Sequence, residues 1–467
     1  MESPLKKCKR CKSAAATIES RTELFCNDCF AKFVCQKGRK RMMSNEFYRD
    51  HFKVLYGKDK NSNIKETPIV FPFDFSAPSL TSMDIMCGLM KEQRRQHRGR
   101  VGFRVYVVTV FRDTTERDLY RDMWSRMHEE NDRMVDEDWK QFEFHLIDAN
   151  KFFKDGTRLM KITLNSEISE CTGVPLEADK SYTISELMKS CVDKSARGDM
   201  WKIIVRHFVK NFAYQHKDVE LIFWSDSMTR LANEVLGLII KGRGSQIARR
   251  LDMNSFDEDY DCQFKSLYAL KDILLTELNT YCYITGINKF IIGDPPRETV
   301  FLDNDTRFPK EMSGIKLAKN MTISELVGKY FDDVEADYSN VISTVLRMGD
   351  KIVPPNRKPL AQKCAICSNL VYIDPHEWTR STVVATGHPV ETEEEKMMYT
   401  RWLESKASAT ETSGCTERCT DKGANITLCY GCIVNLSGTK DKTIIWPKNS
   451  REELEEILKE YVLDDED

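Results

Sequence analysis

The stretch PIVFPFDFSAPSLTSM, at residues 68–83, reads as a buried strand followed by a turn and the start of a helix. Its first part, residues 68–75, is apolar at nearly every position, as in a strand that is covered on both faces. The next apolar residues recur at helical spacing and would share one helix face: Leu80, Met83, Met86 or Cys87, and Met90. A strand, a turn and a helix in this order predict an α/β domain with a parallel sheet.

Three further apolar segments extend this pattern along the chain. Residues 101–111, 142–147 and 219–224 are each expected to form a strand, and the last two are followed by polar turn residues and a helical pattern. We therefore predict that residues 61–350 form one α/β domain, nucleotide-binding-like in fold, on a mostly parallel sheet.

The first strand-to-helix turn is where such folds bind phosphate, because free backbone N–H groups at a helix N-terminus point at the anion. A phosphate-binding turn favours glycines, which let the backbone approach closely, and uses every N–H group. Here Ala77 carries a Cβ atom and Pro78 has no N–H group. The sequence therefore predicts a degenerate phosphate loop, made of Ser76, Ala77, Pro78, Ser79 and Thr81.

Two pairs of cysteines near the start of the chain, Cys8 with Cys11 and Cys26 with Cys29, have the CxxC spacing of zinc ligands. The 14 residues between the pairs leave room for a hairpin, whose turn we expect around residues 21–23. A disulfide pair or scattered buried thiols are the alternatives. Disulfides suit secreted proteins, but the opening MESPLKKCKRCK has no apolar stretch and cannot be a signal peptide.

A second set of four cysteines, Cys364 with Cys367 and Cys429 with Cys432, lies near the other end of the chain. A metal site can close the 61 residues between these pairs, because loop entropy grows only slowly with length. Within this loop, residues 391–414 are rich in Glu, Ser and Thr and are expected to be a flexible insertion. Other residues could replace or add ligands: Cys415, Cys419, His376 and His388. We predict two structural zinc sites, one near each end.

The composition is that of an ordinary globular protein, with 467 residues and 41 % hydrophobic content, enough for two or three domains. No apolar run approaches the roughly 18 residues that span a bilayer, so no membrane association is expected. The 16 cysteines are most simply placed in a reducing compartment, the cytosol. We therefore expect a cytoplasmic protein of three parts: a zinc knuckle at residues 1–60, the α/β domain at 61–350 and a zinc module at 351–467.

Charge is distributed unevenly along the chain. Residues 1–60 carry 15 Lys or Arg against 7 Asp or Glu, whereas residues 450–467 carry 2 against 9. A basic, metal-bound head suggests contact with nucleic-acid phosphates, and a solvated surface without a partner is the alternative. The acidic tail begins with a capping box at Ser450 and Glu453 and predicts a short amphipathic helix.

Two basic segments in the middle of the chain are candidates for contact with RNA or a protein partner. Residues 91–104 contain six basic residues against one acid, and residues 241–244 combine two basic residues with two glycines. The named candidates are Arg94, Arg95, Arg98, Lys241 and Arg243. A solvated helix end is the alternative for the first segment, and a helix C-cap turn is the alternative for the second.

Several of these features, in this order, resemble a known family. They are the basic CxxC head, the strand, loop and helix at residues 73–83, the stretch SDSMTRLA at residues 225–232, the GRG loop at residues 242–244 and the closing CxxC pairs. Over nearly its whole length the chain is similar to the cytoplasmic tRNA 2-thiolation protein 2 family, the second subunit of the wobble-uridine thiolation complex. That family is related to PP-loop ATP-pyrophosphatases. The resemblance implies a PP-loop, adenine nucleotide alpha hydrolase-like parallel sheet flanked by N- and C-terminal zinc ribbons.

The resemblance also implies that the catalytic loop has been lost. The catalytic sister subunit carries a Ser-Gly-Gly-x-Asp-Ser loop, and residues 76–81 here lack both glycines and the aspartate. No HExxH, Walker-type or Ser-His-Asp pattern replaces it in the sequence. We therefore expect no catalytic residue and no ATP binding.

Iron-sulfur chemistry is expected to be absent as well. The sister subunit's central CxxC and a later cysteine are thought to hold a cluster, whereas this chain has Cys191 near the corresponding place and no recognisable pair at Cys262 or Cys282. Cys191 could still carry a persulfide, since nearby Lys194 and Arg197 would lower the pKa of its thiol. A structural cysteine is the alternative.

The function implied by the resemblance is support of sulfur transfer onto tRNA. The chain would pair with the catalytic sister subunit and bind tRNA. The complex would 2-thiolate 5-methoxycarbonylmethyl-uridine at wobble position U34 of the tRNAs for Lys, Glu and Gln, with sulfur from a thiocarboxylated ubiquitin-related modifier that also acts in protein urmylation. Two alternatives stay open: an active tRNA-adenylating enzyme using the hydroxyls of Ser76, Ser79 and Thr81, and a zinc-ribbon scaffold for RNA or protein unrelated to thiolation.

Overall fold

The computed structural model divides the chain into two compact units. The first consists of Met1–Ala149 and Lys202–Pro354, and the second of Asn150–Trp201 and Pro355–Asp467. The residues described are 7–56, 66–153, 158–165, 171–176, 182–293, 299–302, 321–335, 338, 340–354, 363–375, 390, 392–411 and 424–448. No helix among them is both long and apolar enough to cross a membrane.

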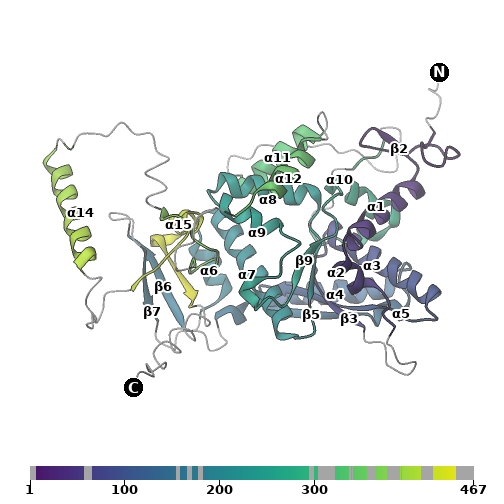
Figure 1. The fold of residues 1–467 in the computed structure, drawn as a ribbon, viewed down its shortest axis with the longest axis horizontal. Helices are drawn as coiled ribbons and strands as arrows, with labels where there is room; N and C mark the ends of the chain where they lie inside the picture. The colour runs from purple at the N-terminus through teal and green to yellow at the C-terminus, as the bar shows by residue number, and fades with distance from the viewer. Residues whose placement is uncertain are drawn as a thin grey trace. The chain divides into compact units, whose positions relative to one another are not determined.

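The first unit is built on a five-stranded parallel sheet with the order β5-β4-β3-β8-β9 (Figure 1). Its strands are β3 (Thr67–Pro72), β4 (Phe103–Phe111), β5 (Phe142–Asp148), β8 (Leu221–Trp224) and β9 (Lys265–Tyr268). Four of them lie where the sequence pattern predicts strands. The predicted parallel α/β sheet is confirmed.

Helices cover both faces of this sheet. They are α1 (Asn27–Met42), α2 (Glu46–Phe52), α3 (Ala77–Gln96), α4 (Thr114–Glu130), α5 (Asp136–Trp139), α7 (Lys194–Gln215), α8 (Met228–Ile240), α9 (Ile247–Leu251), α10 (Leu275–Thr285), α11 (Ile323–Glu335) and α12 (Asn340–Lys351). Successive side chains of a strand point to opposite faces, so Ile69 and Phe71 join the core beneath α1, α3 and α10. Val70, between them, joins the core beneath α8 and α12. Short 3-10 turns complete the two units at Ala149–Phe153, Gly244–Gln246, Glu258–Tyr260, Ile287–Phe290 and Lys440–Lys442.

The N-terminal segment is part of this first unit. The strands β1 (Ile18–Ser20) and β2 (Glu23–Phe25) form a hairpin whose turn residues, Arg21 and Thr22, have positive φ angles of 50° and 69°. The predicted turn around residues 21–23 is therefore confirmed. Ile18 and Phe25 are buried in the same core as β3, so the expected boundary at residue 60 does not separate a compact unit.

The second unit contains a four-stranded antiparallel sheet with the order β10-β7-β6-β11. Its elements are β6 (Leu159–Leu164), β7 (Cys171–Pro175), α6 (Ile184–Ser190), α14 (Glu393–Glu411), β10 (Ala424–Asn425), α15 (Tyr430–Ser437) and β11 (Thr443–Pro447). The predicted boundary between residues 350 and 351 is therefore incomplete. Residues 150–201 leave the α/β domain because β6 pairs with β11 in an unbroken register from Thr443↔Thr163 to Pro447↔Leu159.

The predicted flexible insertion at residues 391–414 is wrong for most of its length, because α14 occupies Glu393–Glu411. Three glutamates in its first turn stabilise the helix, since they lie at the positive end of the helix dipole. The predicted acidic tail helix at residues 450–467 lies outside the described residues.

Candidate functional site

The strand order of the first unit marks the place where a parallel α/β sheet binds its ligand. The chain runs outward from β3 through β4 to β5 and then returns to the other side of β3 with β8. Ligands of such sheets bind beyond the carboxyl ends of the strands where this order reverses. The turn that follows β3 is therefore the structural counterpart of a phosphate loop, as its sequence predicts.

This turn is closed by its own helix and by a neighbouring helix. The helix α3 begins at Ala77 with Pro78 in its first turn, and every residue from Ala77 to Ser82 is buried. Cys282 of α10 packs there, with its sulfur 3.5 Å from Thr81 Oγ1 and 3.5 Å from the carbonyl oxygen of Ala77. The backbone N–H of Ile292 donates to the carbonyl oxygen of Phe75 at 3.2 Å.

The donors that remain in the turn bind Asp74, a residue of the turn itself. Its Oδ1 accepts hydrogen bonds from the backbone N–H of Ser76 at 3.0 Å, from Ser76 Oγ at 2.5 Å and from Ser79 Oγ at 2.8 Å. Its Oδ2 lies 3.4 Å from the guanidinium of Arg230, which stands in the first turn of α8. Desolvation would raise the pKa of Asp74, but Arg230 and the two serines outweigh it and the pKa is lowered. An N–H group, two hydroxyls and a guanidinium thus surround one carboxylate.

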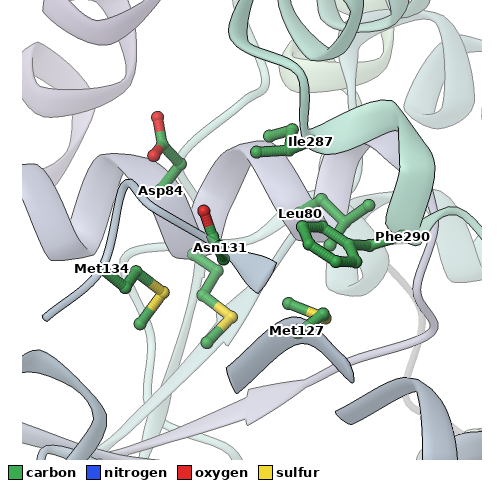
Figure 2. Close-up of a pocket in the computed structure, with 8 residues that line it drawn as sticks. Leu80, Asp84, Met127, Asn131, Met134, Ile287 and Phe290 are labelled. Atoms are coloured by element: carbon green, nitrogen blue, oxygen red, sulfur yellow. The ribbon is translucent and has the colours of Figure 1, made fainter. Parts of the chain in front are cut away.

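A small cavity beside α3 offers no alternative ligand site (Figure 2). Its volume is about 10 Å³, room for roughly one water molecule. Its polar lining residue Asp84 is held by Arg133 through two contacts of 2.8 Å. The cavity is lined by Leu80, Met83, Asp84, Met127, Asn131, Met134, Ile287 and Phe290.

The first four-cysteine cluster is made by Cys8, Cys11, Cys26 and Cys29, whose sulfur atoms all lie within 4.8 Å of one another. The first pair sits on a tight turn, in which the N–H of Lys12 donates to the carbonyl oxygen of Cys8 at 2.9 Å. The second pair straddles the start of α1. The sulfurs of Cys11 and Cys26 are 3.8 Å apart, and a tetrahedron with metal–sulfur bonds of about 2.3 Å has edges of about 3.8 Å.

The second cluster repeats this arrangement with Cys364, Cys367, Cys429 and Cys432, again within 4.8 Å. One pair lies on a turn and the other straddles the start of α15, with 3.7 Å between the sulfurs of Cys367 and Cys429. The N–H of Ala365 donates to the carbonyl oxygen of Thr427 at 3.1 Å, which ties the two halves together. The alternative ligands Cys415, Cys419, His376 and His388 lie outside the described residues.

The two clusters differ in their exposure to solvent. Cys11 of the first cluster is exposed, and hydrogen bonds from Ser13 and the backbone of Ala14 lower the pKa of its thiol to about 6. In the second cluster no cysteine is exposed, and Cys364 and Cys432 are at most 1 % exposed. Burial raises the pKa of Cys364, and the neighbouring thiols raise the pKa of Cys432, both well above the usual value.

The structure contradicts the persulfide reading of Cys191. This residue ends α6, is fully buried, and has a pKa raised by that burial. Arg197 donates to the carbonyl oxygen of Cys191 at 2.9 Å, and its charge lowers the pKa of the thiol by less than burial raises it. Cys282 is buried against Thr81, whereas Cys262 is exposed. Apart from the two clusters, the described part of the chain has no group of three or more metal-ligating side chains that converge on one point.

The basic candidates separate into buried and exposed residues. Arg94 forms an ion pair with the buried carboxylate of Asp138 and donates to the carbonyl oxygen of Glu137 at 2.9 Å, so it serves the fold. Arg243 is only 6 % exposed and follows Gly242, which has a φ of 67°, so this segment is the helix C-cap turn that was the alternative reading. Lys241 beside it is half-buried, whereas Arg95 and Arg98 are exposed.

Comparisons with known proteins identify the family. A family model described as cytoplasmic tRNA 2-thiolation protein 2 matches residues 322–434. Proteins of that name from Vanderwaltozyma polyspora and Candida glabrata are 37 % and 36 % identical to this chain, cover 98 % of it, and are themselves covered over 97 % and 99 % of their lengths. The corresponding protein of Saccharomyces cerevisiae is 35 % identical over 97 % of this chain and 98 % of its own length.

Among solved structures, the U34-tRNA thiolase NcsA from Methanococcus maripaludis with its [4Fe-4S] cluster is similar with a TM-score of 0.45 and 12 % identity, over 82 % of this chain and 98 % of that one. The full-length similarity to the fungal proteins is the decisive finding. This chain belongs to the cytoplasmic tRNA 2-thiolation protein 2 family.

Proposed function

We propose that this protein is a non-catalytic, tRNA-binding subunit of a cytoplasmic complex that 2-thiolates the wobble uridine U34 of tRNA. The family name of its relatives supports the role in tRNA 2-thiolation. In this proposal a catalytic sister subunit activates the 5-methoxycarbonylmethyl-uridine of the tRNAs for Lys, Glu and Gln. Sulfur comes from a thiocarboxylated ubiquitin-related modifier.

The position of Asp74 is the observation that carries the non-catalytic part of the proposal. Its carboxylate holds the Ser76 N–H, the hydroxyls of Ser76 and Ser79, and the guanidinium of Arg230. These are the kinds of donor that a phosphate needs at a helix N-terminus. A phosphate in this place would have to displace a carboxylate and would meet its negative charge, so we infer that ATP does not bind here.

The hydroxyls that an adenylating enzyme would use point to the same conclusion. Ser79 donates to Asp74, and Thr81 is buried against the sulfur of Cys282. Neither is presented to a nucleotide. The reading as an active adenylating enzyme therefore finds no support in the arrangement of this turn.

We further propose that each four-cysteine cluster holds one structural zinc ion. The sulfur spacings of 3.7 and 3.8 Å fit the edge of a tetrahedral zinc–thiolate site, and cysteine is a preferred ligand of structural zinc. The eight ligands would be those predicted from the sequence: Cys8, Cys11, Cys26, Cys29, Cys364, Cys367, Cys429 and Cys432. The metal would fix the two CxxC turns of each cluster and contribute its binding free energy to folding.

Deletion of this chain from its host tests the proposal most directly. We expect 2-thiouridine to disappear from the wobble position of the three tRNAs, as measured by mass spectrometry of purified tRNA, and to return when the chain is re-expressed. Retained 2-thiouridine would contradict the proposal. Re-expression of an Asp74→Asn variant is the matched test of the loop, and it should restore thiolation because this loop performs no chemistry.

A second experiment separates the catalytic and non-catalytic readings. Titration of the isolated chain with Mg-ATP in a calorimeter should show no binding at millimolar nucleotide. The isolated chain, mixed with ATP and tRNA in a single turnover, should release no pyrophosphate. Either signal would establish that the chain is an adenylating enzyme and would overturn its assignment as a non-catalytic subunit.

A further inference from the structure

A second surface of the first unit combines an exposed tyrosine and a half-buried histidine with exposed arginines that form no ion pair among the described residues. It is formed by the segment after α2 and by the turn between α3 and β4, and we call it the Tyr56 surface. Its residues are Lys53, Tyr56, Arg95, His97, Arg98 and Arg100. The turn leads directly into Phe103, the first residue of β4, so the surface lies at the amino ends of the parallel strands. The phosphate loop lies at their carboxyl ends.

We propose that the Tyr56 surface binds an unpaired nucleotide of RNA, with the base stacked on Tyr56 and His97 and the flanking phosphates held by Arg95, Arg98 and Arg100. The inference rests on the proposed function only for the identity of the RNA, a tRNA. The surface lies at the end of the sheet opposite the phosphate loop, so it is separate from that turn. The surface serves tRNA capture, which a non-catalytic subunit can supply.

The buried side chain of Gln93 joins the segment after α2 to the turn between α3 and β4. Its Nε2 donates to the carbonyl oxygen of Phe52, and its Oε1 accepts from the N–H of Gly102 at 3.0 Å. The backbones approach so closely that a Cβ atom at position 102 would lie 2.2 Å from the carbonyl oxygen of Lys53. The surface is therefore held in place before any ligand arrives, which lowers the entropy lost on binding.

Tyr56 is the exposed member of the aromatic pair, and His97 is half-buried. Tyr56 is 60 % exposed, and its hydroxyl lies 2.7 Å from Nδ1 of His97, with 5.7 Å between the ring centroids. The contact with His97 holds the tyrosine ring by its edge and leaves much of the ring in solvent. Single-stranded RNA is recognised mainly by stacking of unpaired bases on such aromatic side chains.

The charges of the turn support the same ligand. Arg95, Arg98 and Arg100 are exposed, and in the described ranges no acidic side chain forms an ion pair with any of them. The neighbouring acids are already held by other arginines, since Glu92 binds Arg39 and Asp138 binds Arg94.

The backbone of the turn presents these arginines to solvent. The N–H of Gly99 donates to the carbonyl oxygen of Arg94 at 2.8 Å, and positive φ angles at Arg98 and Gly99 end α3 sharply. Three exposed guanidinium groups, all within three residues of His97 in the chain, suit the phosphates that flank a base stacked on the aromatic pair.

Binding of the full-length chain to a labelled tRNA transcript tests this inference by fluorescence anisotropy. Tyr56→Ala should weaken binding about tenfold because it removes a stacking platform, whereas Tyr56→Phe should bind like the unaltered chain. The triple variant R95Q/R98Q/R100Q should reduce the slope of log affinity against log salt by about 2, since three phosphate contacts are lost. A fully paired, blunt-ended RNA duplex should respond much less to Tyr56→Ala than the transcript does.

A matched triple variant, R117Q/R121Q/R126Q, removes the same charge from α4. Arg121 and Arg126 are exposed and Arg117 is half-buried, and all three pair with acids of the same helix, so this variant should leave the salt slope unchanged. The inference is overturned if both triple variants lower affinity equally, or if Tyr56→Ala binds as tightly as the unaltered chain. It is also overturned if the variants bind tRNA normally but lose a protein subunit, since the surface would then be a protein contact.

The same measurements distinguish this inference from the proposed function. If deletion of the chain leaves 2-thiouridine intact while Tyr56→Ala still weakens RNA binding, the thiolation role fails and the RNA surface stands. If deletion abolishes 2-thiouridine while the Tyr56 variants bind RNA normally, the surface fails and the thiolation role stands. Circular dichroism and thermal melting of each variant confirm that the exposed substitutions leave the fold intact.

Discussion

Each four-cysteine cluster directs its side chains toward one point, whereas the loop after β3 directs its donors at a carboxylate of the same chain. The clusters keep complete sets of soft ligands at tetrahedral spacing. The loop keeps the position of a phosphate site at the strand-order reversal, but Asp74 takes its donors and Pro78 lacks an N–H group.

The difference shows how the two kinds of site satisfy their polar groups. A hydrogen-bonding loop can satisfy its own donors with a nearby carboxylate and still support the strand and helix on either side. A metal cluster cannot replace a missing ligand in this way, because four thiols without metal leave the two turns unconnected. Damage to the clusters should therefore cost far more than damage to the loop.

The largest effect is expected from Cys432→Ser in the second cluster. Cys432 is fully buried, and the two halves of its cluster are joined across 61 residues of chain. Apparent binding free energies of structural zinc are about 10–16 kcal/mol, comparable to the whole stability of a domain. We expect the variant to lose one of two zinc ions and the segments at residues 363–375 and 424–448 to exchange amide hydrogens freely.

The matched control for this experiment is Cys171→Ser, a buried cysteine of β7 in the same unit that belongs to neither cluster. It should keep both zinc ions and retain slow exchange in the two segments. If Cys432→Ser also kept two zinc ions and slow exchange, the second cluster would not be a structural metal site.

A smaller but still large effect is expected where the first cluster meets the sheet domain. The carboxylate of Glu277 is fully buried and binds Arg21 at 2.8 and 2.9 Å and Ser20 at 2.7 Å. Glu277→Ala removes the carboxylate partner of Arg21, which is 32 % exposed and keeps its hydrogen bond to the carbonyl oxygen of Asp272. We therefore expect a loss near the lower end of the about 3–5 kcal/mol that breaking a buried pair costs. Urea denaturation followed by tryptophan fluorescence measures this loss.

The exposed pair formed by Arg10 and Glu23 is the control for that measurement. Both side chains are nearly half exposed, and Glu23→Ala should cost less than about 1 kcal/mol. Equal losses for Glu277→Ala and Glu23→Ala would mean that the hairpin is not anchored through Glu277.

The cysteines of the two clusters and the strand β3 could be predicted from sequence, because the patterns that indicate them are local. The CxxC spacing is recognised within four consecutive residues, and the apolar run before Ser76 alone indicates a buried strand. The sequence also predicts the degenerate loop, since Ala77 and Pro78 stand where a phosphate site needs glycines and free N–H groups.

The partner of the loop and the extent of the second unit could not be predicted, because both depend on residues far apart in the chain. Arg230 forms an ion pair with Asp74, which lies 156 positions earlier in the chain, and β6 pairs with β11, which lies some 280 positions later. Strand patterns do not specify which strands pair, so residues 150–201 were placed in the wrong unit. The short β9 was missed because Lys265–Tyr268 alternates too briefly to stand out.

The basic candidates could be sorted only with the structure, for a related reason. Composition does not separate an arginine that serves the fold, such as Arg94, from an exposed one such as Arg98. The distinction depends on whether an acid from another element lies nearby. Tyr56 carried no signal beyond a single aromatic residue, and its proximity to His97 follows from tertiary packing.

The two clusters should also differ in how quickly they lose metal. Cys11 is exposed, whereas no cysteine of the second cluster is, so thiol reagents reach the first cluster sooner. Titration with a mercurial, with zinc release followed by a chromogenic chelator, should show one fast and one slow zinc ion. Cys11→Ser should abolish the fast phase alone. Loss of the slow phase in that variant would reverse the proposed order of the clusters.

The smallest effect on stability is expected from Asp74→Asn in the loop after β3. The Asp74 side chain is 58 % exposed, so solvent weakens its attraction to Arg230 and the variant should lose at most about 1 kcal/mol at pH 7.

The folded-state pKa of Asp74 lies below its usual value, so its contribution is present above about pH 4 and is lost as pH falls through the folded pKa. Denaturation at pH 7 and pH 3 should therefore show a larger difference from the unaltered chain at the higher pH than at the lower. The variant should still not bind ATP in calorimetry, because Ala77 and Pro78 remain buried beneath α10 whatever the charge at position 74. A loss of unfolding free energy above about 3 kcal/mol, or nucleotide binding by the variant, would show that Asp74 blocks a working phosphate site. Either result would contradict the difference proposed between this loop and the clusters.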